Sequence, residues 1–393
     1  MKVLHVVGSV DPKVGGPSVS IPRLVEFLGK MSVQAALYSF GFPFHEDSKA
    51  LKNIEFYQAP RSWLSSFGGI NLKGRCDFEK ISKNFDLIHN HGMWIYPNSV
   101  ARKVSEKLGI PLVSSLRGHL NSWELGHSKI KKKIAWNLYE RNNLKAVDLF
   151  HATSEFEARM LRKQGFKQPI AVIPNGVDLP GNQSGKTEQN FSECFPQLNH
   201  HKRIILFLSR IHPKKGLDRL IEIWAKLHVH NPDWHLVIAG EGTPEYIHAL
   251  KKKAANLKAD KSIYWSGYLE GKFKDTMLRS AQLFILPSFS ENFGNVVAEA
   301  FAYSLPVITT KDVPWQGIEK NNCGWWAESN SESIEVCLRK ALQSSPEELT
   351  AMGSRGSQWV SAEYGWSKVA EKMMGSYSWL LKRSARPSYI VLD

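Results

Sequence analysis

The chain is poor in cysteine and has no long apolar run. Its four cysteines, Cys76, Cys194, Cys323 and Cys337, are scattered over 393 residues without a CxxC pair. This spacing argues against a disulfide framework or a zinc site and favours unpaired thiols in a reducing compartment. No apolar stretch approaches the roughly 20 residues that cross a bilayer. The apolar N-terminal run ends at Asp11, too early for a signal peptide, so we expect a soluble, cytoplasmic protein.

Motifs of several common function classes are also missing. No GxGxxG turn follows the first apolar run and no acidic residue closes the next, which disfavours an NAD-dependent oxidoreductase. The GxxxxGK[ST] phosphate loop and the HExxH zinc motif are absent. No nucleic-acid-binding module is recognisable, so nucleic acid is not an expected partner.

The formal charge of +14 is concentrated in the first half of the chain. Residues 1–178 contain 25 Lys and Arg against 15 Asp and Glu, a net +10. Phosphorylated substrates or an anionic membrane surface would explain this excess. The densest basic run, Lys129–Lys133, leads into Ile134-Ala135-Trp136. It fits a solvated helix face and a peripheral contact with the inner face of the plasma membrane equally well.

Short apolar runs alternate with helical patterns in two successive series. This alternation predicts two doubly wound, Rossmann-like α/β domains, at 1–178 and 203–365, with a polar linker at 179–202. Ligands of such sheets bind at the carboxyl ends of the strands, and with two domains the natural site is the cleft between them. The strands are expected at 3–7, 35–40, 54–57, 85–89, 112–115, 149–152, 170–173, 204–208, 236–239, 263–265, 283–286 and 307–309.

Two carboxylates flank a glycine directly after one buried strand. Glu291 precedes Gly294 and Glu299 follows it. The glycine permits close backbone approach to a ligand, and the next helix presents the N–H groups of Asn295 and Val296 to an anion. Glu299 can accept hydrogen bonds from a vicinal diol such as ribose, and Glu291 can reach sugar hydroxyls. The alternative is a capping acid and a surface acid, which the preceding strand makes less favoured.

Two more segments follow the first strand of each series. Arg210 and Lys215 come after the strand at 204–208 and can neutralise a diphosphate leaving group. A basic surface loop is the alternative. Gly15 and Gly16 follow the first strand, and a Gly-Gly turn before a helix suits approach to a phosphate or sugar.

Histidines cluster at expected strand ends of the first domain. His89, His91 and His119, with Asp86, are conceivable metal ligands, but no carboxylate cluster accompanies them and no metal is predicted. Substrate contact and a structural role both remain open for them. Trp94 is either a platform for a sugar ring or a core residue.

Taken in order, these segments resemble glycosyltransferase family 4 over almost the whole chain. The segments are Gly15-Gly16, Asp86–Gly92, Val172–Asp178, Ser209-Arg210 with Lys214–Gly216, Ile238–Gly242, the Glu291/Glu299 pair and Ser361–Ser367. The resemblance implies a GT-B fold, in which two Rossmann-like domains face a central cleft. It also implies a C-terminal helix, at about 366–393, that returns to the first domain.

The resemblance implies a retaining glycosyltransferase that needs no metal or other cofactor. Such an enzyme moves a hexose-type sugar from a nucleotide-diphosphate sugar to a hydroxyl of a glycan or polyprenyl-diphosphate-linked glycan, in cell-surface polysaccharide or lipopolysaccharide synthesis. The implied roles are the diphosphate for Arg210 and Lys215, the ribose for Glu299, the transferred sugar for Glu291 and the backbone of Phe293, Gly294 and Asn295, and closure over the donor for Gly15 and Gly16.

One segment departs from the family pattern. Many members have a histidine at the end of the strand matching 112–115, near the reacting carbon, where this chain has Arg117, with His119 two residues later. Both are candidates for that place. Arginine is not a base at neutral pH, so a phosphate-stabilising role suits Arg117. His91 and Trp94 belong to a His-Gly-x-Trp segment similar to that of members acting on cell-surface polysaccharides, which makes them acceptor-side candidates.

Two alternative functions fit the same fold. A nucleotide-sugar epimerase or hydrolase would consume donor without an acceptor. A non-catalytic sugar- or lipid-binding protein would bind without turnover.

Overall fold

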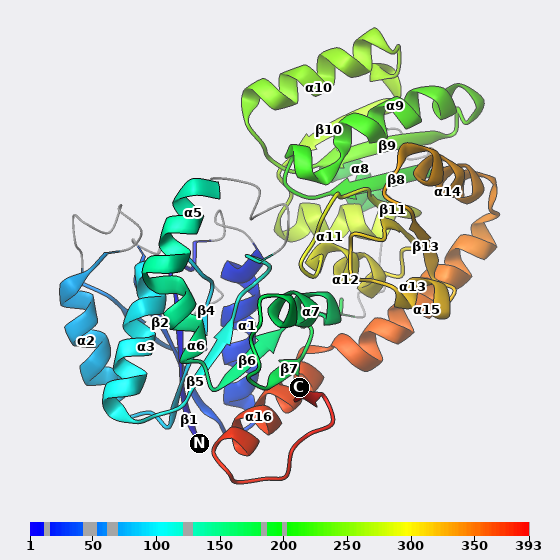
Figure 1. Cartoon of the computed structure of the whole chain (residues 1–393). Helices are drawn as coiled ribbons and strands as arrows, with labels where there is room; N and C mark the ends of the chain where they lie inside the picture. The colour runs from blue at the N-terminus through cyan, green and yellow to red at the C-terminus, as the bar shows by residue number, and fades with distance from the viewer. Residues whose placement is uncertain are drawn as a thin grey trace. The chain divides into compact units, whose positions relative to one another are not determined.

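The computed structural model describes residues 1–11, 16–41, 53–60, 70–120, 129–181, 187–198 and 203–392, without the side chains of 129 and 187–190. The chain divides into two compact units, one formed by Met1–Gly176 with Trp366–Asp393 and the other by Val177–Gly365. Each unit is built around one sheet of parallel strands, apart from one antiparallel edge strand in the first, with helices beside it (Figure 1). The predicted α/β class with two Rossmann-like domains is therefore confirmed.

The first unit contains an eight-stranded sheet in the order β14-β7-β6-β5-β4-β1-β2-β3. All neighbours are parallel except the pair of β14 and β7. The strands are β1 (Lys2–Val7), β2 (Gln34–Ser39), β3 (Glu55–Gln58), β4 (Leu87–His91), β5 (Leu112–Ser115), β6 (Leu149–Ala152), β7 (Ile170–Val172) and β14 (Ile390–Val391).

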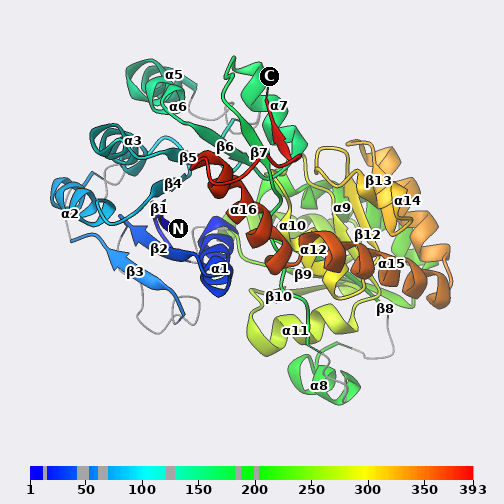
Figure 2. The ribbon, with the colours of Figure 1, turned by 90° about the horizontal axis from the view of Figure 1, so that it is seen from below.

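Helices cover both faces of this first sheet. The bounds are α1 (Gly16–Lys30), α2 (Leu72–Ser82), α3 (Tyr96–Leu108), α5 (Lys129–Ala135), the π-helical turn η4 (Trp136–Glu140), α6 (Arg141–Lys145), α7 (Glu155–Lys163) and α16 (Trp366–Leu380). Alternate strand residues point to opposite faces, so Val3 and Val7 pack with α1 and α16, and Leu4 and Val6 join the core beneath α2 and α3. Helix α16 lies beside α1 (Figure 2).

The second unit contains a six-stranded parallel sheet in the order β10-β9-β8-β11-β12-β13. Its strands are β8 (Arg203–Leu208), β9 (Trp234–Ala239), β10 (Ile263–Gly267), β11 (Leu283–Leu286), β12 (Val307–Thr310) and β13 (Gly324–Ala327). Its helices are α8 (Thr187–Cys194), η5 (Pro213–Lys215), α9 (Leu217–Leu227), η6 (His228–His230), α10 (Pro244–Asn256), η7 (Asp260–Ser262), α11 (Gly271–Ser280), α12 (Asn295–Ala302), α13 (Gly317–Lys320), α14 (Ser331–Gln343) and α15 (Pro346–Tyr364).

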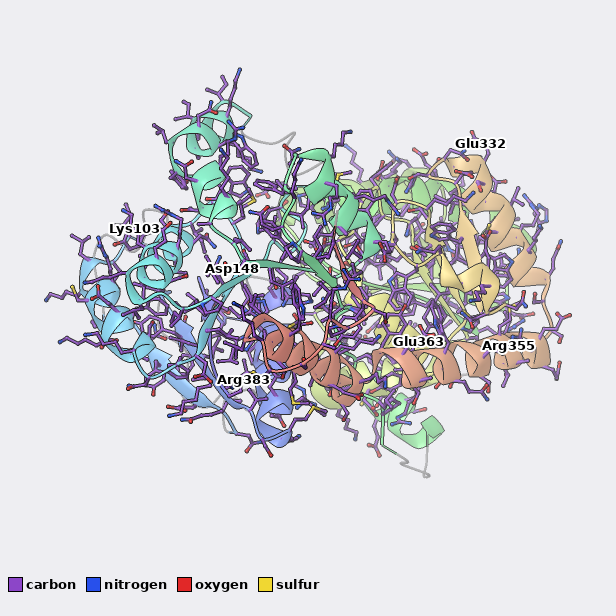
Figure 3. The ribbon with its side chains drawn as sticks, turned by 60° about the horizontal axis from the view of Figure 1, so that its bottom comes forward. Lys103, Asp148, Glu332, Arg355, Glu363 and Arg383 are labelled. Carbon is purple, nitrogen blue, oxygen red and sulfur yellow. The ribbon has the colours of Figure 1, made fainter. Side chains whose placement is uncertain are left out.

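Polar side chains fix the ends of several elements. Asp148, which precedes β6, accepts a hydrogen bond from the Leu112 amide (2.8 Å), and Arg383, beyond α16, lies 3.5 Å from the Asp86 carboxylate (Figure 3). Arg355 on α15 donates to the Asn322 carbonyl (2.8 Å). Within the described ranges, none of the helices combines the length and apolar character needed to span a membrane.

The predicted linker at 179–202 needs correction. Part of it folds as α8, which packs on α11. Phe191, Phe195 and Leu198 are buried in the core of the second unit. Phe191 lies on α8, and Phe195 and Leu198 lie in the residues that follow it. Three apolar side chains among many polar ones are enough to anchor the segment, and a low average hydrophobicity conceals them.

Replacing Phe191 with alanine tests whether α8 belongs to that core. Removal of a buried phenylalanine ring leaves a cavity and should lower the free energy of unfolding by about 3–5 kcal/mol. Chemical denaturation monitored by circular dichroism measures the change. The control Val229→Ala alters a side chain that is 67% exposed and should have little effect. If the Phe191→Ala protein were as stable as the control, α8 would not belong to the core and the predicted linker would stand.

Candidate functional site

The second sheet has a topological switch point between β8 and β11. Strand β8 is followed by β9 on one side in the sheet, and the later strands β11, β12 and β13 extend on the other. Open α/β sheets bind ligands outside the carboxyl ends of the strands that flank such a point. The loops that follow β8 and β11 are therefore where a ligand site is expected.

Those two loops are bonded to each other. The Phe289 amide donates to the Lys214 carbonyl (2.9 Å). Gly216 has φ +71°, and a Cβ there would lie 2.2 Å from the Pro287 carbonyl oxygen. Only glycine allows both the left-handed backbone and this close approach.

An ion pair between Lys215 and Glu291 joins the side chains of the two loops. The side chains are 10% and 12% exposed, and the Ser288 hydroxyl donates to the same Glu291 oxygen (2.7 Å). Burial raises the pKa of Glu291, but Lys215 and the hydrogen bond from Ser288 outweigh it, and the net pKa lies below its usual value. Glu291 is therefore ionised at neutral pH.

The start of α12 adjoins this pair in the chain. Gly294, with φ +82°, precedes the helix, and Asn295 and Val296 form its first turn. Amides in a first helical turn have no partner within the helix and favour anions. The Phe293 carbonyl accepts a hydrogen bond from Trp315 Nε1 (2.6 Å), which fixes the backbone just before this helix.

The other predicted residues of the second unit differ in their surroundings. Glu299 lies one turn into α12 and forms an ion pair with Lys274 of α11 (2.8 Å), both side chains being about one-third exposed. Arg210 is exposed in the loop after β8. Lys215, Glu291 and the start of α12 thus come together, and Lys274 is a cation that the sequence patterns did not single out.

The first sheet has its own switch point, between β1 and β4. His5 of β1 pairs in register with His89 of β4, and His91 ends that strand. All three rings are buried. Arg117 follows the neighbouring strand β5, so a cation stands beside this group of histidines.

Arg117 is held by neutral acceptors. Its guanidinium donates to Asn175 Oδ1 (2.5 Å) and to His91 Nδ1 (3.3 Å). Burial lowers its pKa to about 10, although the nearby buried carboxylate of Glu157 acts to raise the pKa, so Arg117 stays charged at neutral pH. Its backbone is left-handed, with φ +56°. Among the described residues, no carboxylate lies within ion-pair distance of this guanidinium.

The buried histidines are neutral. Burial, with repulsion from Arg117, lowers the pKa of His5 and of His151 to about 3. Burial and the neighbouring rings and Arg117 hold the pKa values of His89 and His91 well below the usual value. These rings act as hydrogen-bonding groups without charge.

Ligand atoms of His5, His89 and His91 lie within 4.8 Å of one another, which raises the question of a metal. The donor set does not fit a cation. His5 Nδ1 and His91 Nε2 are hydrogen-bonded to each other (2.9 Å), and the positive charge of Arg117 touches the same group. Asp86, also a conceivable metal ligand from its place in the sequence, lies at the other end of β4, just before the strand begins. Its carboxylate accepts a hydrogen bond from the Lys2 amide (2.9 Å).

The remaining predicted residues of the first unit are dispersed. His119 lies half-buried in the turn after β5. Trp94 has φ +69° and a half-buried ring 6.1 Å from that of Trp136, and its carbonyl accepts from Tyr139 (3.3 Å). Gly16 is the exposed first residue of α1, and Gly15 lies outside the described residues. Arg117 contacts His91 at the end of β4.

Two family models together match most of the chain. "Glycosyltransferase Family 4" matches residues 14–180 and "Glycosyl transferases group 1" matches residues 190–359. The D-inositol 3-phosphate glycosyltransferase of Segniliparus rotundus is 26% identical over 310 residues, which are 76% of this chain and 67% of that protein.

Solved structures share the fold. Anabaena Alr3699/HepE, in complex with UDP and glucose, is 18% identical with a TM-score of 0.76, covering 96% of this chain and 99% of that one. WaaG, a glycosyltransferase involved in lipopolysaccharide biosynthesis, is 18% identical with a TM-score of 0.69, covering 94% and 98%.

The fold and the matched models define a transferase of the GT-B class, an enzyme that transfers glycosyl groups. The chain belongs to glycosyltransferase family 4. The family resemblance seen in the motifs is thereby confirmed.

The buried neutral histidines predict a dependence of stability on pH. An unfolded histidine takes up a proton near pH 6.5, whereas His5 and His151 resist protonation down to about pH 3. Between these values the unfolded chain binds more protons, so stability is full above pH 6.5 and is lost as the pH falls. Each such ring should remove up to about 1.4 kcal/mol from the free energy of unfolding per pH unit.

Denaturant unfolding between pH 7 and pH 5 measures this loss. The variant His151→Asn, which has no ring to protonate, should show a shallower dependence than the wild type. The control His230→Asn removes an exposed histidine of η6 and should keep the wild-type dependence. Equal pH dependence in all three proteins would contradict the neutrality of the buried rings.

Proposed function

We propose that the protein is a retaining glycosyltransferase that takes a hexose-type sugar from a nucleotide-diphosphate donor and passes it to a hydroxyl of a glycan or lipid-linked glycan. The observation that supports this most is the ion pair of Lys215 with Glu291, beside the start of α12 at the switch point of the second sheet. A cation, an ionised acid and a helix N-terminus at one strand edge suit a sugar diphosphate.

In this proposal, the donor is bound by groups of the second unit. Arg210, Lys215 and the amides of Asn295 and Val296 take the diphosphate. Glu299 accepts hydrogen bonds from the ribose, and Lys274 is released from it. These ligands match the UDP of the HepE complex in chemical class.

Glu291 and the Phe293–Gly294 backbone hold the transferred sugar. The acceptor hydroxyl attacks the anomeric carbon on the face that the leaving group departs from. The bond from that carbon to the phosphate oxygen breaks, its electron pair stays with the phosphate, and the phosphate takes the acceptor's proton. Fixed positive charge stabilises the departing phosphate, so no metal is required.

Arg117 is proposed to contact an anionic group of the substrate complex. It is a charged, largely buried side chain that donates to two neutral acceptors, Asn175 and His91. A buried cation gains most from an anion that arrives with the substrate. His119 is the alternative for this place, and Trp94 with Gly16 remain candidates for contacts to the two substrates.

The acceptor is proposed to lie at an anionic membrane surface. Helix α5 and the turn η4 carry Ile130, Ile134 and Leu138, which are 77%, 54% and 71% exposed. Their spacing of four residues places them along one side of the helix, and Lys131 and Lys133 are exposed on the same segment. An exposed apolar row with lysines is typical of a helix that lies on anionic lipid. Such a surface would present polyprenyl-diphosphate-linked glycans, and WaaG, of similar fold, acts in lipopolysaccharide biosynthesis.

A screen of nucleotide sugars followed by product analysis tests the function. Sugars of UDP, GDP, ADP and dTDP are compared for the rise in melting temperature that tight binding causes. The best donor is then incubated with and without glycan acceptors, in EDTA and in Mg²⁺. We expect an α-linked product from an α-linked donor. The rate of its formation should be the same in EDTA as in Mg²⁺. Donor consumed without acceptor would favour the epimerase or hydrolase, and binding without turnover the non-catalytic protein.

Substitutions of the two glutamates should separate turnover from donor binding. Glu291→Gln removes a charge beside the reacting sugar and should lower kcat about 10²- to 10³-fold with little change in donor KM. Glu299→Ala should raise donor KM about tenfold or more, because a hydrogen bond from ribose to a charged acceptor is lost. Steady-state kinetics gives both constants.

The control Glu328→Gln removes an acid of the same unit that pairs with Lys311 at the surface. It should leave both constants unchanged. The roles would be refuted if Glu291→Gln and Glu299→Ala raised donor KM alike while kcat stayed at the wild-type value.

Vesicle binding tests the membrane contact. The double variant Ile130→Ser, Leu138→Ser should bind phosphatidylglycerol vesicles about tenfold or more weakly than the wild type, because each aliphatic side chain contributes about 1.5–3 kcal/mol when buried. Binding should also weaken with salt and be much lower on phosphatidylcholine. The control Val229→Ser changes an exposed aliphatic residue of the second unit. Equal binding to neutral and anionic vesicles would remove the proposed contact.

A further inference from the structure

Two chains of hydrogen bonds run through the buried histidines of the first unit, and each has a defined direction. The first chain ends at the Ile173 carbonyl, which can only accept. His151 Nε2 must therefore donate to it (2.8 Å), and in a neutral ring this leaves Nδ1 as an acceptor. The Ser115 hydroxyl must donate to His151 Nδ1 (2.6 Å).

The first chain of hydrogen bonds continues from Ser115 to Tyr377 of the C-terminal helix α16. Because the Ser115 proton is used, its oxygen accepts from His89 Nε2 (2.7 Å). His89 Nδ1 then has no proton and accepts from the Tyr377 hydroxyl of α16 (2.6 Å). Burial raises the pKa of Tyr377, so its proton is retained. One arrangement of protons satisfies the whole chain from Tyr377 to Ile173.

The second chain starts at Arg117, which can only donate. Its contact with His91 Nδ1 (3.3 Å) requires that nitrogen to be unprotonated. His91 Nε2 therefore carries the proton and donates to His5 Nδ1 (2.9 Å). His5 in turn has its proton on Nε2, a buried atom for which the described residues provide no acceptor.

The two chains of hydrogen bonds also contact each other through their imidazole rings. The three rings form a triangle, with centroid distances of 4.1 Å between His91 and His89, 5.2 Å between His91 and His5, and 4.9 Å between His5 and His89. The His91 and His5 rings are stacked at 9°. His5 and His89 are also register partners in β1 and β4. The ring that accepts from Arg117 is thus in contact with both other rings.

We propose that the imidazoles of His5, His89, His91 and His151, with Ser115 and Tyr377, are positioning residues that hold Arg117 in place with neutral acceptors and so leave its charge available to an anionic group of the substrate. This inference rests on the proposed function, because it assigns Arg117 a role in the reaction. A carboxylate in place of His91 would fix the guanidinium as well but would neutralise it.

The identity of the group at each position supports a role beyond packing. Apolar side chains would fill this space without the cost of burying polar atoms. A protonated His91 would turn its acceptor into a second donor facing a cation, and the contact with Arg117 would be lost. The neutral Nε2–H tautomer is the form of this ring that both accepts from Arg117 and donates to His5.

A matched pair of substitutions separates positioning from packing. Asparagine places its amide close to the Nδ1 position of histidine, whereas glutamine places it close to Nε2. His91→Asn therefore keeps an acceptor for Arg117 and loses the contact with His5, and His91→Gln does the reverse. Both variants lose the same ring, so each is the packing control for the other.

We expect His91→Gln to lower kcat about tenfold or more, the effect of one hydrogen bond to a charged group, and His91→Asn to retain most of the activity. Donor KM should be unchanged in both, because the donor is assigned to the second unit. Equal loss in the two variants, or loss in His91→Asn alone, would overturn the positioning role.

A second measurement needs no turnover. Long-range ¹H–¹⁵N spectra of the full chain with ¹⁵N-labelled histidine report the tautomer of each ring, and single histidine variants assign the signals. At pH 7 we expect His5, His89, His91 and His151 to be neutral with the proton on Nε2. A charged ring, or a proton on Nδ1 of His91, would refute the inference even if glycosyl transfer is confirmed. The expected tautomers with no transfer activity would instead contradict the proposed function.

Discussion

The ion pair of Lys215 with Glu291 is the contact on which the site of the second unit depends. Both charges are about nine-tenths buried, and 76 residues separate them in the chain. A buried ion of this kind is stable only with its partner, and loss of one partner typically costs about 3–5 kcal/mol. The pair therefore keeps the loops after β8 and β11 together, keeps Glu291 ionised, and places a cation and an acid at one strand edge next to the start of α12.

The first unit uses the same position in its sheet with a different charge arrangement. In this sheet too the strand order reverses between two central strands, because β2 and β3 lie on one side of β1 and the later strands lie on the other, beginning with β4. Polar groups gather at the carboxyl ends of β1 and β4. The cation of this unit, Arg117, has neutral partners in place of a carboxylate. A paired cation can exchange its carboxylate for a ligand with little change in charge, whereas a cation held by neutral acceptors gains a directly bonded opposite charge when the ligand arrives. We infer that an anionic ligand group changes the net charge around Arg117 more than it changes the net charge around Lys215.

Much of the fold and part of the site could be predicted from sequence because the signals are local. Alternating strand and helix patterns gave both parallel sheets, and Glu291 and Lys215 stood out since each follows a buried strand. The remaining features depend on contacts between distant segments. His5 is a polar residue within a mostly apolar strand, and its role is visible only when β4 pairs with β1 in register. Tyr377 reaches His89 across 288 residues, and Lys274 meets Glu299 only through the packing of two helices.

Hydrogen–deuterium exchange on adding a nucleotide diphosphate is the most direct test of the donor site, because it locates the bound nucleotide without any assumption about the acceptor. UDP, GDP, ADP and dTDP would each be added to the full chain and exchange followed by peptide. We predict that the nucleotide that binds slows exchange in residues 209–216 and 287–299, which comprise the two loops joined by Lys215 and Glu291 and the start of α12. Protection confined to other segments, or binding of none of the four nucleotides, would contradict it.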